Sequence, residues 1–214
     1  MSLKNSYLLI YNTINALLWT RILFTLLSAL FLSAPPDSQT IYTTLEPWTR
    51  WTQTLAALEI VHSALDLTRA PIFTTFTQIF ARTVQVWAIN YAYPEATISA
   101  TNPMSTWSAS SLVYPAMLFA WSLADAIRYT YFAVLSGGGP QAVPGSVKWL
   151  RYSLFLGLYP IGIASEWVLM FRATLVADHI LVKAIFVFFL GLYAPGSVMM
   201  YKYMVKQRRK VLFA

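Results

Sequence analysis

Residues 148–171 read KWLRYSLFLGLYPIGIASEWVLMF, a segment in which only Lys148, Arg151 and Glu166 are charged. A helix needs about 20 mostly apolar residues to cross the ~30 Å hydrocarbon core of a bilayer. This segment is long enough and apolar enough, and five other segments of the chain are too. The six expected membrane-spanning helices cover approximately residues 7–32, 48–68, 72–93, 112–135, 147–171 and 180–203.

The connections between these segments contain residues that end helices. Each of the connecting segments 34–37, 69–71, 93–103 and 137–145 contains proline or glycine, and both residues interrupt a helix. The first segment is too long for the apolar core of a signal peptide, so we interpret it as the first span. No soluble domain fits between the segments. The sequence therefore predicts an all-α polytopic membrane protein, a single domain over residues 1–214 built as a six-transmembrane-helix bundle.

The composition supports a membrane protein. The chain is 57% hydrophobic and 11% charged, with a mean hydropathy of +0.55, whereas soluble domains carry about 25% charged residues. The 15 Lys and Arg exceed the 8 Asp and Glu, but most of the excess lies at span ends, which indicates membrane topology rather than nucleic-acid binding. The sequence has no cysteine, which excludes a disulfide, a cysteine-ligated metal and a thiolate nucleophile.

Basic residues near the span ends predict the orientation of the chain. One side of the membrane collects Lys4, Arg69, Lys148, Arg151, Lys202, Lys206, Arg208, Arg209 and Lys210. The other side collects Arg50, Arg172 and Lys183. The positive-inside rule then places both termini in the cytosol. The second span is the most polar, and its loss would put the termini on opposite sides.

Polar side chains inside the spans need an explanation, because a charge at a helix centre costs about 2.5–3.5 kcal/mol on insertion scales. These side chains are Arg21, Glu59, His62, Asp66, Gln78, Arg82, Gln85, Asp125, Arg128, Tyr152, Tyr159 and Glu166. Several share helix faces, and five lie near the middle of the membrane: Glu59, Arg82, Asp125, Arg128 and Tyr159. We therefore expect a buried polar cavity. The alternative is a set of interhelical ion pairs that hold the bundle together.

The individual polar residues differ in what they indicate. For Asp125 and Arg128, which can pair within one helix, we favour the structural interpretation. His62 and Asp66 lie near a cytosolic span end, where a solvated or supporting role fits best. We expect His179 to be solvated in a loop. The two histidines are far apart in the sequence, so no metal site is expected.

Tyr159 and Glu166 are seven residues apart in the fifth span, so a helix places them on one face, ~10.5 Å apart along its axis. Between them, Pro160 removes a backbone donor and crowds the carbonyl of Leu156, which bends a helix and opens space beside it. A phenol and a carboxyl on either side of such a gap are typical of an acid/base pair with a substrate between them. Tyr159 could instead only bond a neighbouring helix.

These residues resemble the 3-hydroxyacyl-CoA dehydratases of very-long-chain fatty acid elongation, also called protein tyrosine phosphatase-like A proteins. The match that resembles the family's fifth-span signature is Leu150-Arg151-Tyr152-x-x-Phe155-x-x-Leu158-Tyr159-Pro160-x-Gly162-x-x-x-Glu166. Three further matches occur in the expected order: Leu58-Glu59-Ile60-x-His62, Thr77-Gln78-x-x-x-Arg82 and Trp121-Ser122-x-x-Asp125-x-Ile127-Arg128-Tyr129. The similarity runs from about residue 11 to residue 203.

The resemblance implies that the protein removes water from a (3R)-3-hydroxyacyl-CoA to give the trans-2-enoyl-CoA. We assign Glu166 as the base and Tyr159 as the acid, and the reversed assignment stays open. The residues expected to bind substrate or support this pair are Glu59, Gln78, Arg82, Arg128, Arg151, Tyr152 and Gly162. Arg151 is expected near the cytosolic mouth, facing the phosphates of coenzyme A. No cofactor is implied beyond the coenzyme A that the substrate carries, and no metal.

The resemblance also implies a multi-pass protein of the endoplasmic reticulum membrane, with membrane lipid and other elongation enzymes as partners and no nucleic acid. The chain departs from the family pattern at Asp66, where Gly is usual, and at Asp125, where Glu is usual. It also ends without a dilysine retrieval signal. Two other functions remain open. One is a non-catalytic lipid-binding or scaffold protein of the same fold, and the other is a small transporter, which the lack of an inverted repeat disfavours.

Overall fold

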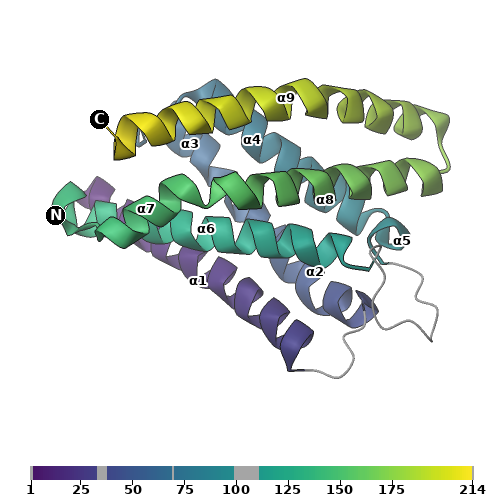
Figure 1. The fold of residues 1–214 in the computed structure, drawn as a ribbon, viewed down its shortest axis with the longest axis horizontal. Helices are drawn as coiled ribbons and strands as arrows, with labels where there is room; N and C mark the ends of the chain where they lie inside the picture. The colour runs from purple at the N-terminus through teal and green to yellow at the C-terminus, as the bar shows by residue number, and fades with distance from the viewer. Residues whose placement is uncertain (1, 33–37, 69, 99–110, 214) are drawn as a thin grey trace.

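The computed structural model describes residues 2–32, 38–68, 70–98 and 111–213, and this part of the chain is helical with no strand. Figure 1 shows long helices that run side by side, with both chain ends at the same end of the bundle. The elements are α1 (Leu3–Phe31), α2 (Ser38–Leu55), α3 (Leu58–Ala64), α4 (Ile72–Val84), the π-helix η1 (Gln85–Tyr91), α5 (Pro94–Thr97), α6 (Val113–Gly138), the 3₁₀-helix η2 (Pro140–Ala142), α7 (Gly145–Ser153), α8 (Phe155–Val176) and α9 (Ile180–Leu212).

Among the described residues, three helical segments are long and apolar enough to cross a membrane: Leu3–Phe31, Gly145–Val176 and Ile180–Leu212. They coincide with the first, fifth and sixth expected spans. Many of their large apolar side chains face outward, and Phe24 and Phe188 are 70% and 63% exposed. Outward-facing apolar side chains are expected where a helix borders lipid rather than water.

The second expected span differs most from its prediction. Its helix begins at Ser38 rather than near residue 48, and Pro47 lies inside it. Hydropathy missed the first part because this part is amphipathic, with Ile41, Tyr42 and Leu45 buried on one face. The helix is then interrupted at residues 56–57, where backbone bonds reach only three residues back, before α3 begins.

The fifth span is interrupted at Leu154, between α7 and α8. We expected the distortion at the carbonyl of Leu156, because Pro160 has no backbone N–H to donate to it. The helix instead continues through Pro160, and the irregular residue lies one and a half turns earlier, where Leu154 O accepts from both Gly157 N and Leu158 N. The strain of a proline falls on the turns that precede it, which explains the direction of the shift.

The core lies where α6 packs between α1 and α8, with α9 on the other side of α8. Trp19, Ile22 and Leu26 of α1 are buried there, as are Met117 and Leu118 of α6. α6 therefore borders both the helices at the N-terminal half of the chain and those at its C-terminal half. This central position brings its polar residues into contact with side chains from distant parts of the sequence.

Asp66 ends α3 in the left-handed backbone conformation, with φ of 52°. The side chain is exposed, and Leu67 N bonds the carbonyl of His62 across this turn. Glycine adopts this conformation without a steric cost, and Asp is among the few other residues that tolerate it. Asp66 is thus a turn residue after the end of α3, although we expected it inside the second span.

Candidate active site

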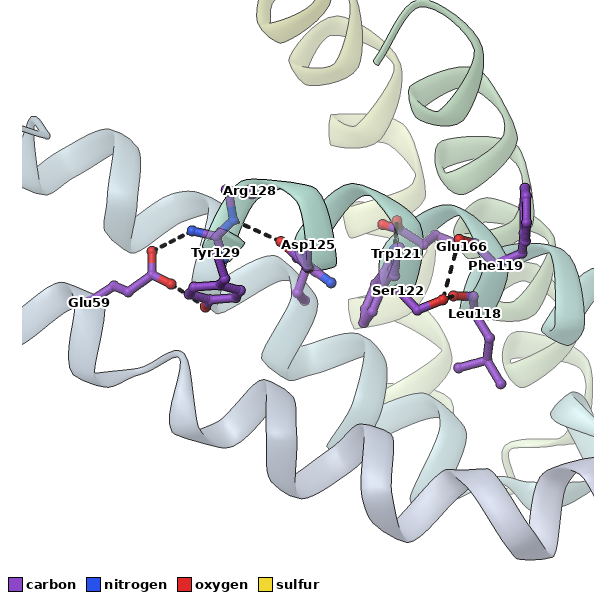
Figure 2. Close-up of polar contacts among 10 residues, drawn as sticks. Glu59, Leu118, Phe119, Trp121, Ser122, Asp125, Arg128, Tyr129 and Glu166 are labelled. Carbon is purple, nitrogen blue, oxygen red and sulfur yellow. Dashed lines mark hydrogen bonds and ion pairs between the residues drawn. The ribbon is translucent and has the colours of Figure 1, made fainter. Parts of the chain in front are cut away.

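Glu166 lies where α6, α8 and α9 meet, and its side chain is almost completely buried. Trp121 Nε1 of α6 donates to Glu166 Oε1 at 2.7 Å. The hydroxyl of Tyr193, from α9, donates to Glu166 Oε2. Figure 2 shows the Trp121 indole directed at the carboxylate. Each carboxylate oxygen therefore has one neutral donor, from a different helix.

Tyr159 lies half-buried on the same helix as Glu166 and is directed toward α9. Its hydroxyl donates to the carbonyl of Ser197 at 3.2 Å, and its ring centroid is 6.0 Å from that of Tyr201. The expectation that Tyr159 joins Glu59, Arg82, Asp125 and Arg128 in one interior is therefore wrong. Those residues lie among α3, α4 and α6, whereas this face of α8 packs on α9.

A cavity of ≈ 290 Å³, open to the outside of the bundle, lies between α8 and α9. Its lining is mostly apolar and comprises Pro160, Ile163, Ala164, Trp167, Val168, Tyr193, Ala194 and Ser197. The part contributed by α8 begins directly after Tyr159 and extends past Glu166. Two lining residues contact the expected acid/base pair, since Tyr193 bonds Glu166 and Ser197 bonds Tyr159.

The charged residues that we expected near the middle of the membrane form a chain of ion pairs, which we call the ion-pair cluster. Arg82 of α4 pairs with Asp125 at 2.5 Å. Arg128 pairs with Asp125 at 2.8 Å, one turn away on α6, and with Glu59 of α3 at 2.8 Å. The hydroxyl of Tyr129 also donates to Glu59. Figure 2 shows Glu59, Tyr129, Arg128 and Asp125 in a row along α6. These groups neutralise one another, as the structural interpretation of Asp125 and Arg128 anticipated.

Trp121 connects the ion-pair cluster to Glu166. The guanidinium carbon of Arg82 lies 3.9 Å from the centroid of the Trp121 ring, while the Nε1 of the same indole bonds Glu166. Within the described part of the chain, the Nε and Nη2 atoms of Arg82 have no hydrogen-bond partner. Arg82 thus retains buried donors beside the indole.

Three other predicted residues lie near this site or at the end of the bundle. Gly162 is buried one turn before Glu166, and a Cβ there would be 3.7 Å from both Ala120 Cβ and Glu166 Oε1. The guanidinium of Arg151 lies 5.7 Å from the Tyr152 ring centroid, and the Arg151 Nε has no hydrogen-bond partner among the described residues. The Tyr152 ring also packs edge-on against that of Tyr131.

In the described part of the chain, the remaining polar residues form no hydrogen bond or ion pair with Glu166 or with the ion-pair cluster. Gln78 is exposed and its amide bonds Met200 Sδ of α9 at 3.1 Å. Arg21 is exposed and stacks on the Trp48 ring. His62 is buried but bonds the hydroxyl of Tyr7 at 2.8 Å, away from Glu166. Gln85 bonds Asn90 within η1, where the helix widens into a π-helix.

Sequence reasoning missed Tyr193 entirely and treated Trp121 only as part of a motif. The available signal was that Tyr193 stands in the apolar run FFLGLYAPG of residues 188–196. A phenol in such a run needs a hydrogen-bond partner, because none is available in hydrocarbon.

Among the described residues, no group of three or more His, Asp or Glu side chains is placed to hold a metal ion.

Comparisons with known proteins converge on one family. Residues 53–214 match the family profile described as protein tyrosine phosphatase-like protein, PTPLA. The chain is 34% identical to a probable very-long-chain (3R)-3-hydroxyacyl-CoA dehydratase of Schizosaccharomyces pombe, over 98% of this chain and 94% of that protein. No solved structure matches it.

Two further relatives come from a plant and an animal. The chain is 31% identical to the very-long-chain (3R)-3-hydroxyacyl-CoA dehydratase PASTICCINO 2 of Arabidopsis thaliana, over 98% of this chain and 94% of that protein. It is 29% identical to very-long-chain (3R)-3-hydroxyacyl-CoA dehydratase 2 of Homo sapiens, over 98% of this chain and 82% of that protein. Similarity over nearly the whole chain covers every residue of the candidate site.

Proposed function

The chain belongs to the protein tyrosine phosphatase-like (PTPLA) family, and we propose that it is a very-long-chain (3R)-3-hydroxyacyl-CoA dehydratase, a hydro-lyase of fatty acid elongation. The observation that carries the proposal is the placement of Glu166. It is a buried carboxyl on an apolar helix, held by neutral donors, beside a mostly apolar cavity. An apolar cavity between membrane helices suits an acyl chain, and a buried carboxyl at its edge suits proton transfer.

The reaction requires two proton transfers. The C2–H bond breaks and its proton passes to a base, while the C3–O bond breaks and the hydroxyl takes a proton from an acid and leaves as water. The electron pair of the C2–H bond forms the double bond between C2 and C3. Because no net oxidation or reduction takes place, the reaction requires no nicotinamide or flavin, and we expect no metal. The substrate supplies its own coenzyme A.

We assign Glu166 as the base and Tyr159 as the acid. Their bonding supports the assignment, because Tyr193 and Ser197 lie one turn apart on the α9 side of the cavity, and Glu166 bonds the first while Tyr159 bonds the second. The two lie ~10.5 Å apart along one helix face, so the substrate would bind between them. The Tyr159 hydroxyl must then exchange the Ser197 carbonyl for the leaving hydroxyl. The reversed roles would make the same prediction for single variants.

The other site residues support this pair in our proposal. Arg82 has free buried donors next to Trp121, and such donors can stabilise the charge that builds on the thioester oxygen. Glu59 and Arg128 hold Arg82 in place through Asp125. Gly162 lies one turn before Glu166 on α8, Gln78 bonds Met200 of α9, and Tyr152 lies beside Arg151.

Arg151 is the residue that we propose for the phosphates of coenzyme A. It lies on α7, at the end of the bundle that carries both chain ends (Figure 1). It forms no ion pair with any described residue, and guanidinium groups bind phosphate strongly. The Arg151→Lys variant keeps the charge but loses the planar fork, so it should raise the KM for the acyl-CoA more than it lowers kcat.

We also propose that the chain crosses the endoplasmic reticulum membrane six times, with both termini in the cytosol and lipid and elongation enzymes as neighbours. In the described part of the chain, three helices qualify by length and apolarity, and the chain ends lie at one end of the bundle (Figure 1). An even number of crossings accounts for that placement. Tags on both ends should be digested by protease in sealed microsomes, and protection of either tag would contradict the topology.

The activity can be tested with the full-length protein purified in detergent. A long-chain (3R)-3-hydroxyacyl-CoA is added, and the trans-2-enoyl-CoA is followed by mass spectrometry, with the (3S) substrate as a stereochemical control. We expect product from the (3R) substrate only. Absence of product from the folded wild-type protein would contradict the proposal and favour a lipid-binding or scaffold function.

A further inference from the structure

The hydroxyl that reaches Glu166 comes from α9. Tyr193 donates to Glu166 Oε2, whereas Tyr159, on the same helix as Glu166, bonds the carbonyl of Ser197. Tyr193 and Ser197 are four residues apart and therefore lie on one face of α9. α8 and α9 run antiparallel (Figure 1), so Tyr193 lies opposite Glu166 and Ser197 lies opposite Tyr159.

The two bonds to Glu166 restrain the carboxyl in a defined orientation. Trp121, from α6, holds one oxygen and Tyr193 holds the other. A carboxylate has about four acceptor positions, so two donors leave capacity for a substrate proton. Tyr193 also lines the cavity between α8 and α9, whereas Trp121 does not. Of the two donors, Tyr193 is therefore the one at the boundary between Glu166 and the space proposed for substrate.

Resting on the dehydratase function proposed above, we propose that Tyr193 is a positioning residue for the reaction. Its hydroxyl holds the Glu166 carboxyl toward the cavity between α8 and α9, so that the carboxyl meets the acyl chain in a reactive geometry. Misplacement of a reacting group by about 1 Å can cost up to about 10²-fold in rate. Tyr193 acts through Glu166, and it does not itself exchange a proton with the substrate.

The first test is the Tyr193→Phe variant, which removes one oxygen and keeps the ring. We expect kcat to fall about 10- to 100-fold, with little change in KM, because the cavity wall is preserved. The matched control is Tyr203→Phe on the same helix. Tyr203 is 45% exposed, and its hydroxyl accepts only from Gln207 among the described residues. This control should keep wild-type kcat and KM.

The second test separates positioning from packing. If Tyr193 acts through Glu166, adding Tyr193→Phe to Glu166→Gln should lower the residual kcat no further. A packing role predicts that the two losses multiply, and that result would overturn the inference. Should Tyr193→Phe fold poorly, the pair Tyr193→Gln and Tyr193→Met replaces it. The two side chains have similar shapes, but only glutamine can donate, so the Gln variant should retain the higher kcat per folded protein.

The outcomes also distinguish this inference from the proposed function. Wild-type kcat in Tyr193→Phe, together with an inactive Glu166→Gln, would overturn the role of Tyr193 and leave the dehydratase function intact. Equal kcat in the Gln and Met variants would have the same meaning. A folded wild-type protein without dehydratase activity would overturn both.

Discussion

The ion-pair cluster and the Glu166 site both contact α6, yet they treat carboxylates differently. Asp125 and Glu59 each pair with arginine. Trp121 lies one turn before Asp125 on α6 and bonds Glu166 of α8. Glu166 has only the neutral donors of Trp121 and Tyr193, and no described basic residue forms an ion pair with it. A buried ion pair resists protonation change because breaking it is costly. A carboxyl with neutral donors is freer to exchange a proton, so the cluster suits stability and Glu166 suits chemistry.

The comparison predicts that the largest losses of activity come from substitutions of Glu166 and of Tyr159, the two residues proposed to transfer protons. Glu166→Gln and Tyr159→Phe each keep shape and remove a titrating group, so each should lower turnover by about 10²–10⁴-fold. Both proteins should still insert and bind substrate. The measurement is enoyl-CoA formation at matched amounts of folded protein.

The double variant sharpens this prediction. Groups that serve one reaction are non-additive, so combining Glu166→Gln with Tyr159→Phe should cost far less than the product of the two single losses. Near-wild-type turnover in one single variant would remove that residue from the mechanism. Near-wild-type turnover in both would favour a scaffold function.

The cluster should respond in stability first. Arg82→Ala leaves Asp125 without one of its two cations, and breaking a buried pair costs roughly 3–5 kcal/mol. We expect a lower thermal midpoint in detergent, a lower yield and lost activity. The variant Asp125→Ala in the Arg82→Ala background should cost less than the sum of the single losses. Normal accumulation and turnover of Arg82→Ala would show that the ion-pair cluster does not stabilise the bundle.

Tyr129→Phe should have a smaller effect on the same cluster. The Tyr129 ring is almost fully buried and its hydroxyl donates to Glu59. In the variant, Glu59 still pairs with Arg128. Hydrogen bonds to charged groups contribute about 1.5–3 kcal/mol, so thermal unfolding in detergent should report a loss of that size. A loss equal to that of Arg82→Ala would mean that Tyr129 is as important as the cations.

Gly162→Ala should have the smallest effect. A Cβ at this position would make ordinary contacts at 3.7 Å with Ala120 and with Glu166 Oε1. Replacing a helical glycine by alanine stabilises by about 0.5–1 kcal/mol where the site has room. We expect a thermal midpoint at or slightly above the wild-type value. A clear drop in the midpoint would show that α6 and α8 are packed too closely at Glu166 for a methyl group.

Local patterns predicted part of the candidate site. The pairing of Asp125 with Arg128 follows from helix spacing alone, since residues three apart lie side by side. Glu166 was found because a carboxyl in an apolar span demands an explanation. Helix spacing also placed Tyr159 on the face of Glu166, but it could not tell which neighbouring helix that face meets.

What the sequence could not supply was the contact between helices. Tyr193 reaches Glu166 only because α9 packs antiparallel to α8, a tertiary arrangement that no local pattern contains. Gln78 shares the face of Arg82 but is exposed near α9, whereas Arg82 reaches α6. The early start of α2 escaped notice because hydropathy averages over an amphipathic helix that has one buried face.

Trp121 gives the molecule a constraint on how its sequence can be redesigned. The guanidinium of Arg82 lies over the face of its indole, and the indole Nε1 bonds Glu166. Any replacement of Trp121 therefore alters the ion-pair cluster and the Glu166 site together. Substitutions that aim to change acyl-chain preference are better directed at Ile163, Ala164 and Val168, which line the cavity and have no side-chain bond to either region. Under the proposed function, the size of the accepted acyl chain can then be tuned separately from the residues proposed to remove water.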